Sequence, residues 1–254
     1  MIVLPSQTPP LKMSRPHPST TTPKAVDAHP KTLRIIFHVV SAAIMINGFV
    51  GIQGSPITNA IGPQYGGFFQ YLTILGLFAS VTCMLLSTIS DYLPGVTFFR
   101  PIKRVFLLAA LPVELVISSI YWSLVLFAPH LMLPSNSSAG NPSEPSSAEG
   151  MDSLFRIPLW MDISMHLVPA LALIADFFLL ERKFRPPQST YGALLLATTF
   201  GIAYGFWAEH CASINGQFAY PFLNIMNLEQ RVATYVGATF GAWAVFRGLN
   251  WLHK

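Results

Sequence analysis

Charged residues are scarce in this chain of 254 amino acids, in which Asp, Glu, Lys and Arg together make up only 10%. Hydrophobic residues make up 52%, and the mean hydropathy is +0.49. This composition leaves too little polar surface to cover a water-soluble globule. The shortage of charge therefore excludes a soluble globular protein and indicates a membrane protein.

Cysteines and metal-binding patterns are also rare. The two cysteines, Cys83 and Cys211, fall at different depths of the membrane spans predicted below, so no disulfide is expected between them. The seven histidines are dispersed, and without an H-E-x-x-H or paired-cysteine spacing no metal site is predicted. A nucleotide-binding loop and a G-x-S-x-G nucleophile elbow are also absent from the sequence. We therefore expect no cofactor.

Long apolar runs, in contrast, are abundant. Six of them are about 17 to 25 residues long, which is enough for a helix to cross a hydrocarbon core about 30 Å thick. Lipid cannot satisfy free backbone groups and the runs lack the alternation of a barrel strand, so helices are the expected spanning form. The sequence predicts an all-α, polytopic membrane protein with six transmembrane helices. They are expected at about residues 34–52, 69–90, 104–128, 158–180, 190–209 and 231–251.

The basic residues are unevenly distributed between the connections of these spans. Thirteen of the fifteen Lys and Arg residues fall on one side, and only Arg156 and Arg231 fall on the other. Because basic residues near the ends of spans are retained in the cytosol, we expect both termini there. This distribution also explains the net charge of +4 and the pI near 9.2 without a nucleic-acid partner. The cytosolic set is Lys12, Arg15, Lys24, Lys31, Arg34, Arg100, Lys103, Arg104, Arg182, Lys183, Arg185, Arg247 and Lys254.

Two polar segments lie outside the predicted transmembrane domain of residues 34–254 or interrupt it. Residues 1–33 contain seven prolines and no apolar periodicity, which predicts a disordered cytosolic tail. Residues 129–157 form a loop of low complexity on the non-cytosolic side, with a glycosylation sequon at Asn136 whose use stays open. Within the spans, the small-residue spacings Gly201 to Gly205 and Gly237 to Gly241 predict close helix packing.

Ionisable side chains inside hydrocarbon are costly unless they are paired or hydrated, so the few in the predicted spans are candidates for function. His38 and Asp176 lie near the cytosolic ends of their spans, where their side chains are expected to reach the headgroups and to be structural. Glu114 lies near the midplane. It either takes part in chemistry or joins helices as a neutral acid.

A second group of polar residues lies in the leaflet farther from the cytosol. Asp162 and His166 are four residues apart, so the carboxylate can orient the imidazole. Helical rise places Thr73 about 9 Å and His166 about 12 Å from the outer ends of their spans. A base next to the Thr73 hydroxyl would activate it as a nucleophile. The alternatives are a packing threonine on a small-residue seam and a polar pair whose members only satisfy each other.

Short motifs that cover roughly residues 34–251 carry a resemblance to a known family. They are Tyr65-Gly66-Gly67, Tyr71-Leu72-Thr73, Trp160 with Met165-His166, Trp207, Gly216 with Tyr220-Pro221-Phe222-Leu223, and Pro112 with Ile120 and Trp122. This set resembles the androgen-induced gene 1 protein family. The resemblance implies six spans with cytosolic termini, and hydrolysis of fatty acid esters of hydroxy fatty acids by an intramembrane threonine and histidine. In this chain those roles would fall on Thr73 and His166.

The fourth span departs from the family pattern. The family run resembles Asn-His-Gly-Met-His, whereas this chain has Asp162-Ile163-Ser164-Met165-His166 and lacks one histidine at Ile163. The predicted function is a lipid-ester hydrolase in which Thr73 attacks, His166 acts as base and Asp162 orients it. Its partners would be a lipid ester that enters from the bilayer and the membrane lipids themselves, in the endoplasmic reticulum or the cell membrane.

Further residues are expected near the predicted site. Backbone N–H groups at Gly66 and Gly67 are candidates to bind an oxyanion, because they lie at the start of the second span. Two alternatives from other classes stay open, a proton-coupled carrier that uses Glu114, Asp162 and His166, and a non-catalytic membrane regulator. The other candidate pocket residues are Tyr71, Trp207, Glu209, His210 and Tyr220.

Overall fold

The computed structural model describes residues 30–128 and 157–254, and within these ranges every regular element is helical. The predictions for the tail before residue 30, for most of the loop 129–157 and for the sequon at Asn136 lie outside the described residues. The elements are α1 (Lys31–Gln53), α2 (Ile57–Ile61), η2 (Gly67–Gln70), α3 (Leu72–Tyr92), α4 (Phe99–Phe127), α5 (Leu159–His166), α6 (Val168–Ala175), η6 (Asp176–Leu180), η7 (Gln188–Gly192), α7 (Ala193–Asn215), α8 (Pro221–Asn224) and α9 (Leu228–Leu252).

Five helical segments in the described ranges are long and apolar enough to cross a membrane: α1, α3, α4, the run from α5 to η6, and the run from η7 to α7. The sixth predicted span corresponds to α9, which has 25 residues and a length of about 37 Å at the usual helical rise. Its hydropathy is lowered by Glu229, Arg231 and Arg247. The predicted all-α, multi-pass fold is confirmed. The side of the membrane that holds the termini stays a prediction.

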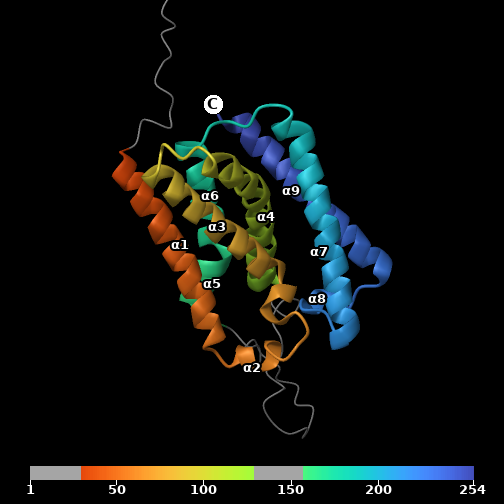
Figure 1. Cartoon of the computed structure of the whole chain (residues 1–254). Coiled ribbons are helices and arrows are strands. Elements are labelled where there is room, and N and C mark those ends of the chain that lie inside the picture. Colours follow the sequence, from red (N-terminus) through yellow and green to blue (C-terminus); the bar gives the residue numbers. More distant parts are fainter. Residues whose placement is uncertain (1–29, 129–156) are drawn as a thin grey trace, which may run out of the picture.

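The helices form a core of four spans and a separate pair. Spans α1, α3, α4 and α5–η6 pack closely on one another around buried Met45, Leu77, Met84, Leu111 and Phe177. The pair α7 and α9 pack mainly against each other, and α9 contacts the core chiefly through α4 (Figure 1). The difference in burial is large, because 56% of the apolar window of the α5–η6 span is buried but only 17% of the η7–α7 span.

The fourth span is not one continuous α-helix. It is interrupted at Leu167, which has φ −121° and ψ −49°, directly after His166. Pro169 explains the interruption, because it has no N–H to offer the carbonyl of Met165 and its ring disfavours the helical conformation of the preceding residue. The break fixes His166 at the end of a helix instead of within one.

The basic segments gather at one end of the bundle. The start of α1, the α3–α4 connection, the η6–η7 connection and the C-terminus all lie there (Figure 1). Arg34, Arg100 and Arg182 line one cavity at this end, and Arg247 donates to the Ser189 carbonyl at 2.9 Å. This grouping is the one that the predicted topology requires.

His38 and Asp176 have a structural role, as predicted, but they fulfil it by pairing inside the protein. Both side chains are almost completely buried at the base of the basic end, and His38 Nε2 lies 2.9 Å from Asp176 Oδ1. Lys103 Nζ lies 2.8 Å from Asp176 Oδ2, and a second carboxylate, that of Asp91, lies 3.2 Å from His38 Nδ1. Mutual pairing compensates the loss of hydration, so the two residues join helices inside the protein.

The small-residue spacings differ in their outcome. A Cβ atom on Gly201 would lie 2.0 Å from Thr239 Oγ1, and one on Gly205 would lie 3.3 Å from Tyr235, so this pair marks the contact of α7 with α9 as predicted. The packing prediction for Gly237 and Gly241 is wrong, because a Cβ on either would meet no atom within 4 Å. These two glycines face away from the neighbouring helices.

Candidate intramembrane active site

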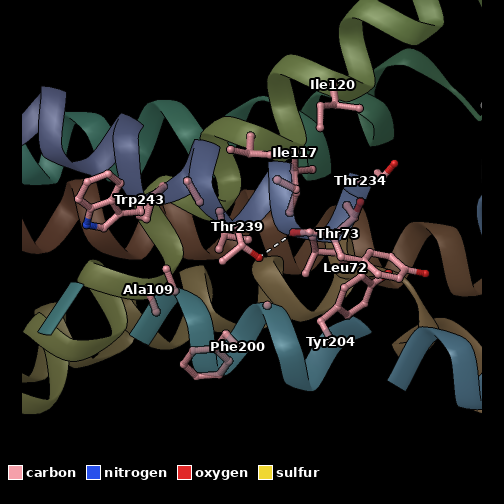
Figure 2. Close-up of a pocket in the computed structure, with 18 of the residues that line it drawn as sticks. Leu72, Thr73, Ala109, Ile117, Ile120, Phe200, Tyr204, Thr234, Thr239 and Trp243 are labelled. Atoms are coloured by element: carbon pink, nitrogen blue, oxygen red, sulfur yellow. Dashed lines mark hydrogen bonds between the residues drawn. The ribbon is translucent and has the colours of Figure 1, made fainter. Parts of the chain in front are cut away.

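An apolar cavity of about 160 Å³ lies between α4, α7 and α9, with the start of α3 and α8 at one end (Figure 2). The described residues that line it include no acidic, basic or histidine side chain, and its polar groups are mainly hydroxyls. Cavities near this size with aliphatic and aromatic walls stay dry and accept apolar ligands. The space therefore suits hydrocarbon, with hydrogen-bonding groups available only at particular points of the wall.

Thr73 stands at the N-terminus of α3 and lines this cavity. Tyr71 precedes the helix in an extended conformation, with φ −89° and ψ 128°, and no side chain caps the first turn. The carbonyl of Tyr71 accepts from the N–H groups of Ile74 and Leu75, which leaves those of Leu72 and Thr73 for other partners. Thr73 is 6% exposed, so its hydroxyl is held in a nearly dry environment beside the first N–H groups of the helix.

Two tyrosines complete a hydroxyl cluster around Thr73. The Thr73 N–H lies 3.5 Å from the Tyr220 hydroxyl oxygen, which is also within hydrogen-bonding reach of the Thr73 and Tyr204 hydroxyls. Burial raises the pKa of the Tyr220 phenol above its ordinary value, so it is protonated at neutral pH and able to donate. Figure 2 shows Thr73 and Tyr204 close together at the end of the pocket away from Trp243.

His166 lies in a second polar group, on α5. Its Nδ1 is 3.0 Å from Asp162 Oδ1 and 3.2 Å from the Asp162 carbonyl oxygen, as the four-residue spacing predicted. Both neighbours of Nδ1 are acceptors, so Nδ1 carries the hydrogen and Nε2 keeps the lone pair of a base. The Tyr121 hydroxyl donates to the same carboxylate oxygen. Asp162 therefore orients the imidazole.

Tyr121 connects the two groups. Its ring stacks on His166 with the centroids 3.5 Å apart and the planes parallel within 1°, and it also lines the cavity that contains Thr73. Among the hydrogen bonds of residues 30–128 and 157–254, none joins Thr73 to His166. Tyr121 thus belongs to both groups, but neither His166 nor Asp162 lines the cavity that contains Thr73.

The two glycines before α3 build a turn. Gly66 and Gly67 have φ of +83° and +47°, and a Cβ on Gly66 would lie 2.9 Å from Cys211 Sγ. The N–H of Gly67 donates to the Gln64 carbonyl at 2.9 Å and is not free to bind an oxyanion. The N–H groups nearest to Thr73 are those at the start of α3, where that of Thr73 donates to the Tyr220 hydroxyl oxygen. Tyr71 packs edge to face against Tyr220 and supports the hydroxyl cluster from outside the cavity.

The remaining predicted pocket residues hold other elements together. Trp207 donates through Nε1 to the Phe69 carbonyl at 2.9 Å and packs with His210 and Tyr65 in an aromatic cluster. Glu209 pairs with Arg231 at 2.7 Å and links α7 to α9. None of these side chains lines the cavity. They fix the walls around it.

Glu114 is fully buried between α3 and α4. Its Oε1 accepts from the Ser80 hydroxyl at 3.1 Å, and its carboxyl group covers Gly76, where an added Cβ would lie 2.7 Å away. No hydrogen bond in the described part of the chain joins Glu114 to Asp162 or His166. The proton relay that the carrier alternative requires is therefore not formed in this conformation.

Sequence reasoning did not assign Tyr121 and Tyr204 to the site. Tyr121 follows Glu114 by seven residues and so shares its helical face, but this spacing gives no hint that the ring stacks on a histidine of another span. Tyr204 lies within an apolar span, where a hydroxyl needs a partner. That need was the available signal, and the Gln70 carbonyl, 3.2 Å from the hydroxyl, meets it.

Comparisons with known proteins match this chain to a family of membrane proteins. The model of a family described as FAR-17a/AIG1-like protein matches residues 33–254. A UPF0641 membrane protein of Schizosaccharomyces pombe is 29% identical over 220 residues, which cover 86% of this chain and 89% of that protein. A UPF0641 membrane protein of Saccharomyces cerevisiae is 27% identical over 148 residues, or 57% of this chain and 55% of its own. No solved structure matches the chain.

Proposed function

Because the chain belongs to the FAR-17a/AIG1-like family, we propose that it is an intramembrane hydrolase of lipid esters, with Thr73 as nucleophile and His166 as general base. One observation carries the proposal. The Thr73 hydroxyl lines an apolar cavity at the N-terminus of α3, within hydrogen-bonding reach of the Tyr220 phenol. The resemblance to androgen-induced gene 1 proteins favours fatty acid esters of hydroxy fatty acids as substrates.

The cavity suits a substrate that is hydrocarbon except for one ester. Its walls on α4, α7 and α9 are aliphatic and aromatic, so they bind acyl chains through burial of apolar surface. The hydroxyls of Thr73, Tyr204 and Tyr220 gather at one end of the cavity, where an ester carbonyl meets several hydrogen-bonding groups together. The Trp243 Nε1, which has no partner among the described residues, is a single donor elsewhere in the lining. Burial of the chains against the walls would therefore place the carbonyl carbon next to the nucleophile.

The reaction would proceed through an acyl-enzyme. His166 Nε2 takes the proton of the Thr73 hydroxyl as Oγ1 bonds to the carbonyl carbon, and the ester C–O bond then breaks. The proton passes from His166 to the departing alkoxide, which leaves as the hydroxy acid. Water repeats the sequence on the acyl-threonine. His166 takes a proton from the water as the water oxygen bonds to the acyl carbon. The bond to Thr73 then breaks, the fatty acid is released, and His166 returns the proton to the Thr73 oxygen.

Two donors lie near Thr73 for the negative oxygen of the tetrahedral intermediate. The Tyr220 hydroxyl keeps its own hydrogen to donate, and the Thr73 N–H, which donates to the Tyr220 oxygen at 3.5 Å in this structure, would serve the intermediate once that oxygen gives way to it. The first turn of α3 also presents its positive dipole end there. In a site with few competing waters these donors act at low dielectric, so each one contributes more than it would in water.

Tyr121 controls the contact between nucleophile and base in this mechanism. A general base must come within about 2.6–3.2 Å of the proton it removes, or reach it through one water, and this contact often forms only when substrate is bound. The Tyr121 ring stacks on His166 and lines the cavity, whereas His166 itself does not line it. The proton can pass from Thr73 to His166 if the Tyr121 side chain turns when substrate enters. It can also pass through one water at the edge of the ring.

The experiment uses membranes that contain the full chain, labelled with a fluorophosphonate probe and assayed for release of free acid from a fatty acid ester of a hydroxy fatty acid. Thr73→Ala should abolish labelling and lower hydrolysis by at least about 1,000-fold, as expected for loss of a nucleophile. Thr73→Ser should retain both. The matched control is Thr239→Ala, which removes a cavity-lining hydroxyl that only donates to the Tyr235 carbonyl.

Thr73→Ala, together with His166→Ala and Glu114→Gln, also distinguishes a hydrolase from a proton-coupled carrier and from a non-catalytic regulator. Labelling and hydrolysis that survive Thr73→Ala would remove Thr73 from the mechanism. A carrier should lose flux with Glu114→Gln and be indifferent to Thr73→Ala, whereas a non-catalytic regulator should tolerate Thr73→Ala, His166→Ala and Glu114→Gln alike.

A further inference from the structure

A second cavity, of about 410 Å³, opens at the basic end of the bundle, far from Thr73 along the spans. It lies between the start of α1, the end of α3, the start of α4 and the residues after η6. Its character is opposite to that of the apolar cavity, because most of its lining is charged or hydroxylic. The lining residues are Lys31, Arg34, His38, Ser87, Ser90, Asp91, Pro94, Arg100, Lys103, Arg104, Glu181 and Arg182.

The charges that line this cavity do not balance. Six are basic and two are acidic, and the lining stays positive when the buried Asp176 beneath it is included. The two acids hold three of the basic groups, since Asp91 pairs with Arg34, and Glu181 pairs with Lys103 at 2.7 Å and with Arg104 at 2.5 Å. Lys31, Arg100 and Arg182 have no ion pair within the described ranges. Positive charge is thus left over at the rim.

The floor of the cavity contains a second feature that indicates a ligand. The Ser90 side chain is 8% exposed, lines the cavity, and its hydroxyl has no hydrogen-bond partner among residues 30–128 and 157–254. A buried hydroxyl without a partner costs free energy, so a group that accepts its hydrogen would be favoured here. The neighbouring Ser87 hydroxyl is already satisfied by the Cys83 carbonyl.

The surroundings of the mouth place it at a membrane interface. The α3–α4 connection next to it exposes Tyr92, Leu93, Val96 and Phe98. Tyr92 also contacts Lys31 of the rim, whose Nζ donates to the Tyr92 carbonyl at 3.2 Å. Exposed aromatic and aliphatic side chains beside basic residues are typical of segments that lie at the level of lipid headgroups. The cavity mouth is therefore within reach of a headgroup.

We propose that this cavity binds the phosphate group of an anionic membrane lipid. The exposed guanidinium groups of Arg100 and Arg182 and the ammonium of Lys31 meet the phosphate at the rim, and the Ser90 hydroxyl donates to it from the floor. Arginine presents its donors in a fork that matches phosphate oxygens. The acyl chains of the lipid remain in the bilayer beside the apolar α3–α4 connection. This site does not depend on the hydrolase assignment, since it lies at the other end of the spans.

The test measures binding of phosphatidate with a fluorophore on one acyl chain to the purified full chain in a neutral detergent, by fluorescence anisotropy. The double variant Arg100→Gln/Arg182→Gln should weaken binding about 30-fold, from about 1 kcal/mol for each basic group near a lipid phosphate. The control Arg185→Gln/Lys254→Gln removes two charges from the same end outside the cavity lining and should keep the wild-type affinity. Equal loss in both double variants would overturn the site.

Ser90→Ala separates a built site from general attraction to a basic surface, because it changes no charge. It should weaken binding about tenfold, the usual effect of one hydrogen bond to a charged group. Unchanged binding in this variant, with an unchanged melting temperature to show that the chain is folded, would contradict the proposal.

Competition identifies the source of the phosphate. Unlabelled dioctanoyl phosphatidate should displace the probe, and dioctanoyl phosphatidylcholine, whose phosphate carries a compensating ammonium, should displace it poorly. Glycerol 3-phosphate should also compete poorly because it lacks acyl chains. If glycerol 3-phosphate competes as well as phosphatidate, the lipid assignment is wrong and the ligand is a soluble phosphoester.

Discussion

The four-span core and the α7–α9 pair form opposite walls of the apolar cavity, and they are stabilised in different ways. The core contains most of the deeply buried ionisable side chains of the described residues, among them His38, Glu114, Asp162, His166 and Asp176. The pair is joined by small residues and by the partly exposed ion pair of Glu209 with Arg231 near one end. Large apolar side chains cover its outer surface, including Leu195, Ile202, Phe206, Val236 and Phe240.

Because of this difference, we expect the core to hold the polar residues in place and the α7–α9 pair to be the more mobile wall. Buried hydrogen bonds and ion pairs depend on geometry, so they hold the core in one arrangement and fix Thr73, Tyr121 and His166 relative to one another. Apolar contacts have no strong directional requirement, and lipid can replace them. The α7–α9 pair is therefore the wall that can separate from α4 at the lowest cost, which makes it the expected route by which a lipid enters the cavity.

The two regions should differ most in how much stability they lose when an ion pair is broken, because the pairs of the core are buried and that of the α7–α9 pair is partly exposed. Asp176→Ala leaves Lys103 and His38 buried without their shared carboxylate and should destabilise the protein by about 3–5 kcal/mol, the usual cost of breaking a buried pair. Glu209→Ala breaks the exposed pair on α7 and α9 and should have a much smaller effect. Thermal unfolding in detergent measures both. Equal melting temperatures would show that the core is not stabilised by its charges.

Removal of tyrosine hydroxyls distinguishes the polar end of the cavity from its apolar walls. Tyr220→Phe deletes the phenol next to Thr73 and should lower kcat by about 100-fold, as for loss of one oxyanion donor. Tyr235→Phe is the matched change on α9, where the hydroxyl donates to Glu209 at 3.1 Å, and should leave kcat almost unchanged. A similar loss in both variants would mean that the hydroxyls act through wall packing and not through the ester.

Glycines test how tightly each wall is packed. A Cβ on Gly48 of α1 would lie 2.7 Å from Ser164 Cβ, so Gly48→Ala should destabilise the core by about 1–3 kcal/mol through overpacking. Gly241→Ala on α9 meets no atom within 4 Å and should stabilise that helix by up to about 1 kcal/mol. Gly201→Ala should fall between them, because the Thr239 hydroxyl in its way can rotate. Melting temperatures in the reverse order would contradict the division into a tight core and a loose pair.

Local patterns in the sequence were sufficient for several of these features. The apolar runs predicted the spans, and the spacing of Asp162 and His166 predicted their pairing, because both depend on residues close together in one helix. The break at Leu167 was not predicted, although Pro169 is a local signal for it. The network of His38, Asp176 and Lys103 and the stacking of Tyr121 on His166 depend on which helices are neighbours. A single sequence contains no direct information about that choice.

The smallest effect is expected at Glu114, which lies in the core but belongs neither to the hydroxyl cluster around Thr73 nor to the polar group of His166. Gln at this position keeps an oxygen to accept from Ser80 and keeps the volume that covers Gly76, so Glu114→Gln should change stability by less than about 1 kcal/mol. Hydrolysis should stay within about twofold of wild type, because the residue does not touch the cavity. Glu114→Ala should destabilise the protein more, since Ser80 loses its acceptor and a cavity forms. Loss of hydrolysis in Glu114→Gln with unchanged melting would show that a proton at this carboxyl is part of the chemistry, and the separation of core scaffold from reactive end would then fail.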